Sequence, residues 1–168
     1  KTDIDKVSWK LDNVDTGVDY RDYPSLSDID NDGMQEILTG TARYGAGGLD
    51  GKFYVLDYNK GSHDFTQKWV FSDGKIYRGA PSIDDINDDG KKEVVFVTGG
   101  GGEDGSDEGT VYVMESNKQG SLDEDDAKWR YNLPYENQPG DYDGEVGHTA
   151  VADIDLDGKK EILVTDYS

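Results

Sequence analysis

A nine-residue acidic segment occurs three times in this chain: DIDNDGMQE at 28–36, DINDDGKKE at 85–93 and DIDLDGKKE at 153–161. Each copy has an oxygen-bearing side chain at positions one, three and five, glycine at position six and glutamate at position nine. Alternate side chains can converge on one ion, and the glycine permits the sharp turn that brings the carbonyl of position seven to the same ion. The three segments therefore predict three calcium sites.

The position of the last acidic residue separates these segments from calcium loops of the EF-hand kind. Loops of that kind end with an acidic residue at position twelve and lie next to helices. Position twelve is Thr39, Phe96 or Val164 here, and the flanking residues are rich in β-branched side chains. We therefore expect each loop to join two strands.

The similarity between the three segments extends into their flanks. Trp9, Trp69 and Trp129 follow one another at intervals of 60 residues. Short apolar runs rich in Val, Ile, Tyr and Phe lie between them and are bounded by Gly, Asp or Asn, which predicts strands. The polar run at 116–127 is expected to be a connecting loop. Four short strands in each stretch of about 60 residues are typical of a four-stranded antiparallel β-propeller blade, so the predicted fold class is all-β.

The length of 168 residues predicts one domain, a single β-propeller segment. Its repeat units are predicted at approximately 12–72, 73–132 and 133–168, the last of them incomplete, with 6–11 as a lone outer strand of a preceding blade. A closed propeller needs about four to eight blades. We therefore expect part of a larger propeller or a propeller completed by other copies. A short open array is the third possibility, although it leaves unpaired strand edges.

The pattern D-x-[DN]-x-D-G-x-x-E between two apolar strands resembles the FG-GAP or VCBS repeats of integrin-α-like β-propellers, and the resemblance covers nearly the whole chain. Of the short elements that name the family, GAP is present at 79–81. The resemblance implies that each loop joins the first two strands of a blade and holds calcium. Since Asn87 replaces a carboxylate, the second site is expected to bind calcium more weakly. The implied side-chain ligands are Asp28, Asp30, Asp32, Glu36, Asp85, Asn87, Asp89, Glu93, Asp153, Asp155, Asp157 and Glu161, and the implied carbonyl ligands are Met34, Lys91 and Lys159.

Charge and composition exclude several classes of partner. A net charge of −20 opposes binding to nucleic acid and to anionic membranes. The chain contains no cysteine, and it has no apolar stretch of about 18 residues that would insert into a membrane. Calcium loops of this open kind are most useful where calcium is abundant, so we expect a secreted protein at the cell surface or outside the cell.

The segments that precede the predicted inner strands are candidates for ligand binding, because they face the mouth of the central channel in a propeller. DYRDYPS at 19–25 and IYRGAPS at 76–82 carry Tyr and Arg at the same repeat position. A guanidinium beside a tyrosine can bind a carboxylate-bearing sugar, although pairing between each Arg and a neighbouring Asp is the alternative. The candidate ligand-binding residues are Tyr20, Arg21, Tyr77, Arg78 and His148.

The expected function is that of a non-catalytic, calcium-stabilised module in an extracellular binding, adhesion or cell-surface structural protein, with a glycan or a protein as its ligand. No nucleophile or paired base accompanies His148 in the sequence. Two alternatives stay open. The segment can belong to a polysaccharide-degrading enzyme similar to the propeller lyases, or it can be a subunit of a self-assembling surface filament or layer. In either case its partners would include further copies or the remaining blades of a larger chain.

Overall fold

The computed structural model describes residues 23–41, 44–45, 48–49, 51–62, 64–77, 79–99, 109–133 and 146–166. These residues form strands and one 3-10 turn, η2 (Glu124–Asp126), and no α-helix occurs within them. The predicted all-β fold class is therefore confirmed. None of the described helical segments is long and apolar enough to cross a membrane. The lone outer strand expected at 6–11 lies outside the described residues.

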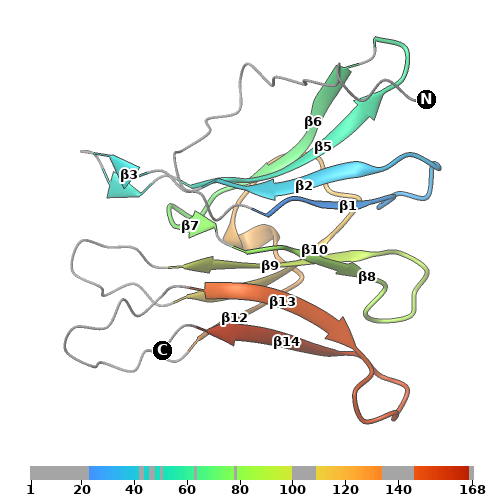
Figure 1. Ribbon diagram of the computed structural model, residues 1–168, viewed down its shortest axis with the longest axis vertical. Helices are drawn as coiled ribbons and strands as arrows, with labels where there is room; N and C mark the ends of the chain where they lie inside the picture. Colours follow the sequence, from blue (N-terminus) through green and yellow to red (C-terminus); the bar gives the residue numbers. More distant parts are fainter. Residues whose placement is uncertain are drawn as a thin grey trace, which may run out of the picture.

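The first sheet is an antiparallel succession of four strands, β1, β2, β5 and β6 (Figure 1), to which a fifth is added from further along the chain. Its strands, in spatial order, are β1 (Ser25–Ser27), β2 (Glu36–Gly40), β5 (Phe53–Asn59), β6 (Asp64–Phe71) and β11 (Gly120–Leu122). β11 pairs with β6 in parallel. Because β11 and η2 both lie within 116–127, the expectation of a plain connecting loop in that run was wrong.

The second sheet repeats the antiparallel order of the first. Its strands are β7 (Ile76–Tyr77), β8 (Ser82–Asp84), β9 (Glu93–Gly99), β10 (Thr110–Glu115) and β12 (Trp129–Asn132). Both β7 and β8 pair with β9 on the side away from β10, so the edge strand of the sheet is interrupted between them. Gly79 lies in the interruption with φ of 84°, and a Cβ atom there would lie 2.2 Å from the carbonyl oxygen of Gly147. A side chain is therefore excluded where the second sheet meets the third.

The third sheet consists of β13 (Val146–Ala152) and β14 (Glu161–Asp166), which pair antiparallel. A small separate hairpin is formed by β3 (Tyr44–Gly45) and β4 (Gly48–Leu49). Figure 1 shows the second sheet between the first and the third, with β13 packed beside β8 and β9. The three sheets follow one another in space in the order in which they occur along the chain.

Equivalent residues occupy equivalent rows in the two larger sheets. Across the first sheet the row reads Ser25, Leu38, Val55 and Trp69, and across the second it reads Ser82, Val95, Val113 and Trp129. In the third sheet the corresponding pair is Ala150 and Leu163. The common register places each acidic loop at the same distance along its strands.

The hydrophobic core lies between successive sheets, because alternate residues of a strand point to opposite faces. One cluster fills the space between the first two sheets, and it contains Leu38, Phe53, Val55 and Trp69 from the first and Val94, Phe96, Tyr112 and Met114 from the second. The other cluster contains Val95, Val97, Val111 and Val113 of the second sheet, against which Val151, Ile162 and Val164 of the third pack. All seven residues of β9 are buried, since both of its faces are covered.

Candidate calcium sites

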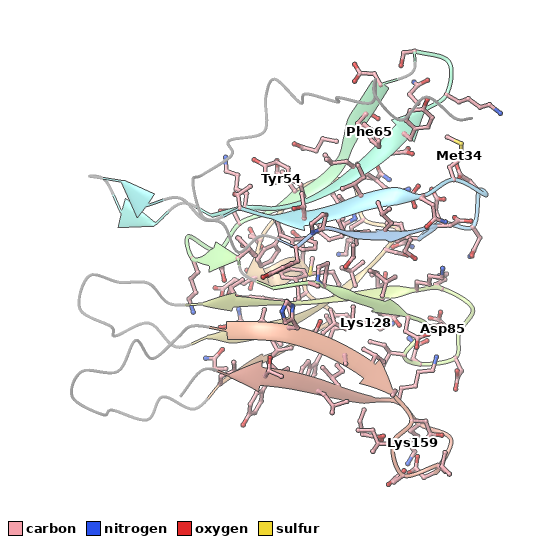
Figure 2. All side chains as sticks on the ribbon, in the orientation of Figure 1. Met34, Tyr54, Phe65, Asp85, Lys128 and Lys159 are labelled. Carbon is pink, nitrogen blue, oxygen red and sulfur yellow. The ribbon has the colours of Figure 1, made fainter. Side chains whose placement is uncertain are left out.

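The three acidic loops connect corresponding strands and lie along one edge of the structure. They join β1 to β2, β8 to β9 and β13 to β14. Figure 2 shows Met34, Asp85 and Lys159, one residue from each loop, at this same edge. The expectation that each loop joins two strands is confirmed.

Each loop is closed by the same set of side-chain to backbone hydrogen bonds. In the first loop the carboxylate of Asp28 accepts from the backbone N–H of Asp32 at 3.1 Å and of Gly33 at 3.0 Å. The carboxylate of Asp32 accepts from the N–H of Met34 at 2.7 Å. Glutamate nine accepts from the N–H of position two in all three loops, at 2.7, 2.9 and 2.8 Å. The bonds of positions one, three and five also recur in the second and third loops.

The backbone of the loops turns through two residues with positive φ. Position six is always glycine, with φ of 88°, 83° and 88°. Position four is Asn31, Asp88 or Leu156, with φ of 63°, 58° and 61°. Asn and Asp tolerate this left-handed conformation, whereas it is unfavourable for Leu. The same turn is thus adopted even where the residue at position four opposes it.

The oxygen atoms of the first loop fit a hard divalent cation. Carboxylate oxygens of Asp28, Asp30 and Asp32 lie within 4.8 Å of one another. Glu36 is fully buried, and its Oε1 atom has no hydrogen-bond partner, while Oε2 is held by the N–H of Ile29. A buried carboxylate oxygen without a partner is costly. An ion bound by the three aspartates would offset their clustered negative charge, and because calcium takes six to eight oxygen ligands it would leave places for further oxygens of the loop.

Lys68 of β6 already supplies one positive charge to the first loop. Its Nζ atom lies 2.5 Å from Oδ2 of Asp30. The hydrogen bond from Lys68 holds the pKa of Asp30 below its usual value, whereas burial raises the pKa of Glu36. The lysine therefore neutralises the exposed rim of the site and leaves the buried Glu36 without a counter-charge in contact.

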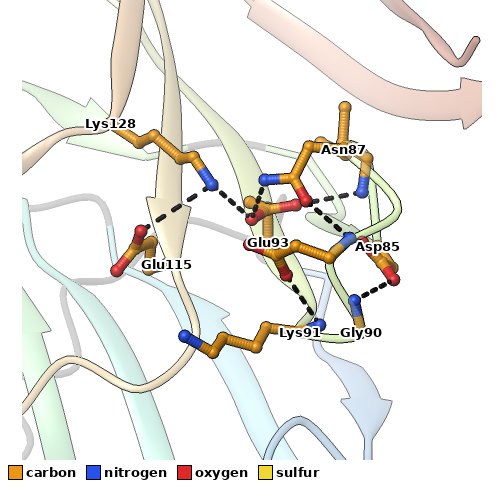
Figure 3. Close-up of polar contacts among 9 residues, drawn as sticks. Asp85, Asn87, Gly90, Lys91, Glu93, Glu115 and Lys128 are labelled. Carbon is orange, nitrogen blue, oxygen red and sulfur yellow. Dashed lines mark hydrogen bonds and ion pairs between the residues drawn. The ribbon is translucent and has the colours of Figure 1, made fainter.

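The second loop, whose contacts Figure 3 shows, differs from the first at position three and in the contacts of its lysine. Lys128 lies at the sequence position equivalent to Lys68, but its Nζ atom contacts Glu93 Oε1 at 2.8 Å. The side-chain amide of Asn87 donates to the same oxygen at 3.2 Å. The hydrogen bond to Glu93 raises the pKa of Lys128. Glu93 thus has two protein donors where Glu36 has an unpartnered oxygen.

The third loop brings carboxylate oxygens of Asp153, Asp155 and Glu161 within 4.8 Å of one another. The ion pair found within the described part of this loop joins Lys159 Nζ and Asp157 Oδ2 at 3.5 Å, and the Lys159 side chain is 83% exposed. An exposed ion pair of this kind contributes little to the free energy of unfolding. In the described part of the chain, protein cations therefore neutralise the carboxylates of the third loop less than those of the other two loops.

A lysine at position eight links the second loop to the first and the third loop to the second. Nζ of Lys92 donates to the carbonyl of Asp28 at 2.7 Å, and Nζ of Lys160 donates to the carbonyl of Asp85 at 2.7 Å. Lys160 also contacts Oδ1 of Asp84 at 2.8 Å. These contacts were not foreseen from the sequence, although the two lysines share a loop position.

Of the candidate ligand-binding residues, the structure describes the side chains of Tyr77 and His148; Tyr20, Arg21 and Arg78 lie outside the described residues. Tyr77 is 2% exposed and packs in the core, and its hydroxyl donates to Asp73 at 3.1 Å. Tyr77 is therefore a core residue and does not belong to the candidate ligand-binding surface. His148 is exposed; its Nδ1 atom accepts from the N–H of Ala80 at 2.9 Å, and its ring contacts that of Tyr23 edge-on. His148 therefore joins the third sheet to the second.

Comparison with known proteins gives no assignment for the chain. No protein-family model matches the sequence, and no curated protein matches it significantly.

Proposed function

We propose that this chain is a calcium-stabilised β-propeller segment of the FG-GAP or VCBS kind. The observation that carries the proposal is the unpartnered, buried Oε1 atom of Glu36 at the end of a loop in which three aspartates converge. The recurrence of one hydrogen-bond pattern in three loops supports it further. On this proposal each loop holds one calcium ion through the carboxylates and the carbonyl of position seven.

The strand order supports the assignment of blades. Two four-stranded antiparallel successions share one register, and a third begins with the same pair of strands and the same loop. Blades of a propeller are four-stranded sheets packed face to face around an axis. We therefore assign β1–β2–β5–β6 and β8–β9–β10–β12 as complete blades and β13–β14 as the first half of another.

Calcium has a structural role in this proposal. The loop carboxylates would repel one another at neutral pH, and an ion bound to the folded loop but not to the open chain stabilises the fold by mass action. Calcium would neutralise the three loops and make them rigid. A module stabilised in this way is suited to presenting a surface to a glycan or a protein outside the cell. The activity proposed is therefore binding or adhesion outside the cell rather than catalysis.

Isothermal titration of calcium-depleted protein with calcium tests the proposal, together with thermal melting in calcium, magnesium or EDTA. We expect three ions to bind for each chain and the melting temperature to fall in EDTA. Magnesium should substitute poorly, because it prefers a smaller octahedral shell. A melting temperature that is the same in calcium and in EDTA would refute the structural role of the ion.

A further inference from the structure

The first residue of the first loop and that of the second loop each contact a lysine from the following unit. Nζ of Lys92 donates to the backbone carbonyl of Asp28 at 2.7 Å, and Nζ of Lys160 donates to the backbone carbonyl of Asp85 at 2.7 Å. Both lysine side chains are partly buried. Because the donor and the acceptor lie 64 and 75 residues apart in the sequence, each contact forms only where two successive units pack together.

The peptide group that accepts from the lysine is also held by its own loop. Between Asp28 and Ile29, the carbonyl accepts from Lys92 and the N–H donates to Oε2 of Glu36 at 2.7 Å. The carboxylate of Asp28 accepts from the N–H of Asp32 at 3.1 Å. One peptide group is thus fixed at both of its polar atoms, once by the following unit and once by the loop itself.

The second loop has the same arrangement with the third. The N–H of Ile86 donates to Oε2 of Glu93 at 2.9 Å, and the carbonyl that precedes it, that of Asp85, accepts from Lys160. Lys160 also donates to Oδ1 of Asp84 at 2.8 Å. Two separate interfaces between units therefore place a lysine ammonium on the same peptide group of a loop.

This peptide group belongs to the residue that provides the first carboxylate of the candidate calcium site. Carboxylate oxygens of Asp28, Asp30 and Asp32 lie within 4.8 Å of one another, and like charges so close repel. Hydrogen bonds from a charged donor are roughly twice as strong as neutral ones. The bond from Lys92 to the backbone of Asp28 therefore holds the first carboxylate in the cluster against the repulsion of the other two.

We propose that Lys92 and Lys160 are positioning residues for the calcium site of the loop before their own, an inference that rests on the calcium binding proposed above. Neither ammonium binds the ion; each one holds the backbone of the first ligand residue. The first and second calcium sites are therefore each built by two successive units. A unit separated from the one that follows it would bind calcium more weakly.

The direction of the effect on affinity distinguishes positioning from a general effect of charge. Lys92→Met removes a positive charge from an acidic part of the molecule, and on electrostatic grounds alone this loss would tighten the binding of a divalent cation. The loss of positioning acts in the opposite direction, because part of the binding free energy would be used to order Asp28. Weaker calcium binding in the preceding loop is therefore expected from positioning and not from charge.

Calcium titration of the 168-residue protein, followed by ¹H–¹⁵N NMR, measures the three loops separately. The probes are the backbone amides of Gly33, Gly90 and Gly158, because each donates to the first aspartate of its own loop. In Lys92→Met we expect the calcium Kd measured at Gly33 to rise about fivefold or more, and the Kd at the other two glycines to change little. Lys160→Met should instead raise the Kd measured at Gly90.

Lys91→Met is the matched control, because it removes the same charge from an exposed side chain one residue earlier and leaves the contact of Lys92 in place. The Kd at Gly33 should not rise in this variant. Lys92→Arg should restore most of the affinity, since a guanidinium can donate to the same carbonyl. Spectra in EDTA show whether each variant is folded, and Lys160→Met carries the test at the second interface if Lys92→Met does not fold.

The possible results separate this proposal from the calcium binding on which it rests. Calcium binding in all three loops, with an unchanged or lower Kd at Gly33 in Lys92→Met, would overturn the positioning role alone. An equal rise in Kd at all three glycines would overturn it as well, since the effect would then be a general loss of stability. If calcium shifts none of the three amides in the unaltered protein, both the positioning role and the proposed function are wrong.

Discussion

Replacing Glu36 by Gln is expected to change stability in opposite directions with and without calcium. Glu36 is fully buried and Oε1 lacks a partner, so burial raises the pKa of this carboxyl. A raised pKa in the folded state means that the charged form opposes folding. The penalty is present above the folded-state pKa and is lost as the pH falls below the ordinary value of about 4.3. Neutral Gln has the same shape and avoids that penalty at pH 7.

The size of the effect in calcium follows from the loss of one bound ion. At a free calcium concentration of 100 times Kd, one site contributes about 2.7 kcal/mol to the free energy of unfolding. For a chain of this length 1 kcal/mol corresponds to roughly 2–4 °C in Tm. Glu36→Gln should therefore lower Tm by about 5–10 °C in calcium, while in EDTA its Tm should equal or exceed that of the unaltered protein.

Differential scanning calorimetry in calcium and in EDTA measures both effects, and isothermal titration counts the ions. Asp125→Asn is the matched control, because it removes the same charge at an exposed residue of η2 outside the loops. The control should leave the ion count and the calcium-dependent part of Tm unchanged. An equal loss of Tm by Glu36→Gln in both buffers would refute the reasoning, since Glu36 would then stabilise the fold by itself.

Two further substitutions test the loop geometry. Lys160→Met removes the donor to the carbonyl of Asp85 and should lower the free energy of unfolding measured in urea titrations. Lys159→Met, at an exposed neighbour, should change that free energy little, and equal effects of the two substitutions would contradict the link between loops. Leu156→Asn, at φ of 61°, should raise the free energy of unfolding by about 1 kcal/mol, because Asn tolerates this conformation. No gain in urea titrations in EDTA would contradict the account of backbone strain.

The sequence was sufficient to predict the all-β class and the place of each loop between two strands. Runs such as EVVFVTG and TVYVME are rich in β-branched residues and form β9 and β10. β11 was missed because Gly-Ser-Leu has no strand signal of its own. It becomes a strand through its pairing with β6, some 50 residues earlier in the chain. Local propensity cannot report a pairing that depends on how two units pack.

Equivalence in sequence also failed to predict the surroundings of individual side chains. Trp69 and Trp129 share a repeat position but differ in exposure, because burial of each depends on a strand that comes from another unit. Tyr77 was placed among candidate ligand residues on its repeat position, and the structure buries it instead. Its ring packs against Phe53 and Phe71, so its position serves the core.

Lys68 of β6 and Lys128, directly before β12, show how the residue at loop position three changes the contact that a lysine makes. Lys68 contacts the carboxylate of Asp30 at loop position three. In the second loop that position holds Asn87, whose amide oxygen carries no charge and already accepts from the N–H of Asp89 at 2.9 Å. Lys128 contacts Glu93 instead. The residue at position three thus decides whether the ammonium lies at the exposed rim of the loop or at its buried glutamate.

This difference bears directly on the proposed calcium sites. A calcium ion in the second loop would have to displace both the ammonium of Lys128 and the amide of Asn87 from Glu93 before that carboxylate could bind it. In the first loop Glu36 Oε1 needs no displacement, and the ion competes with Lys68 for Asp30 alone. The lower affinity expected for the second site therefore has two causes. It has one carboxylate fewer, and a protein cation already contacts Glu93.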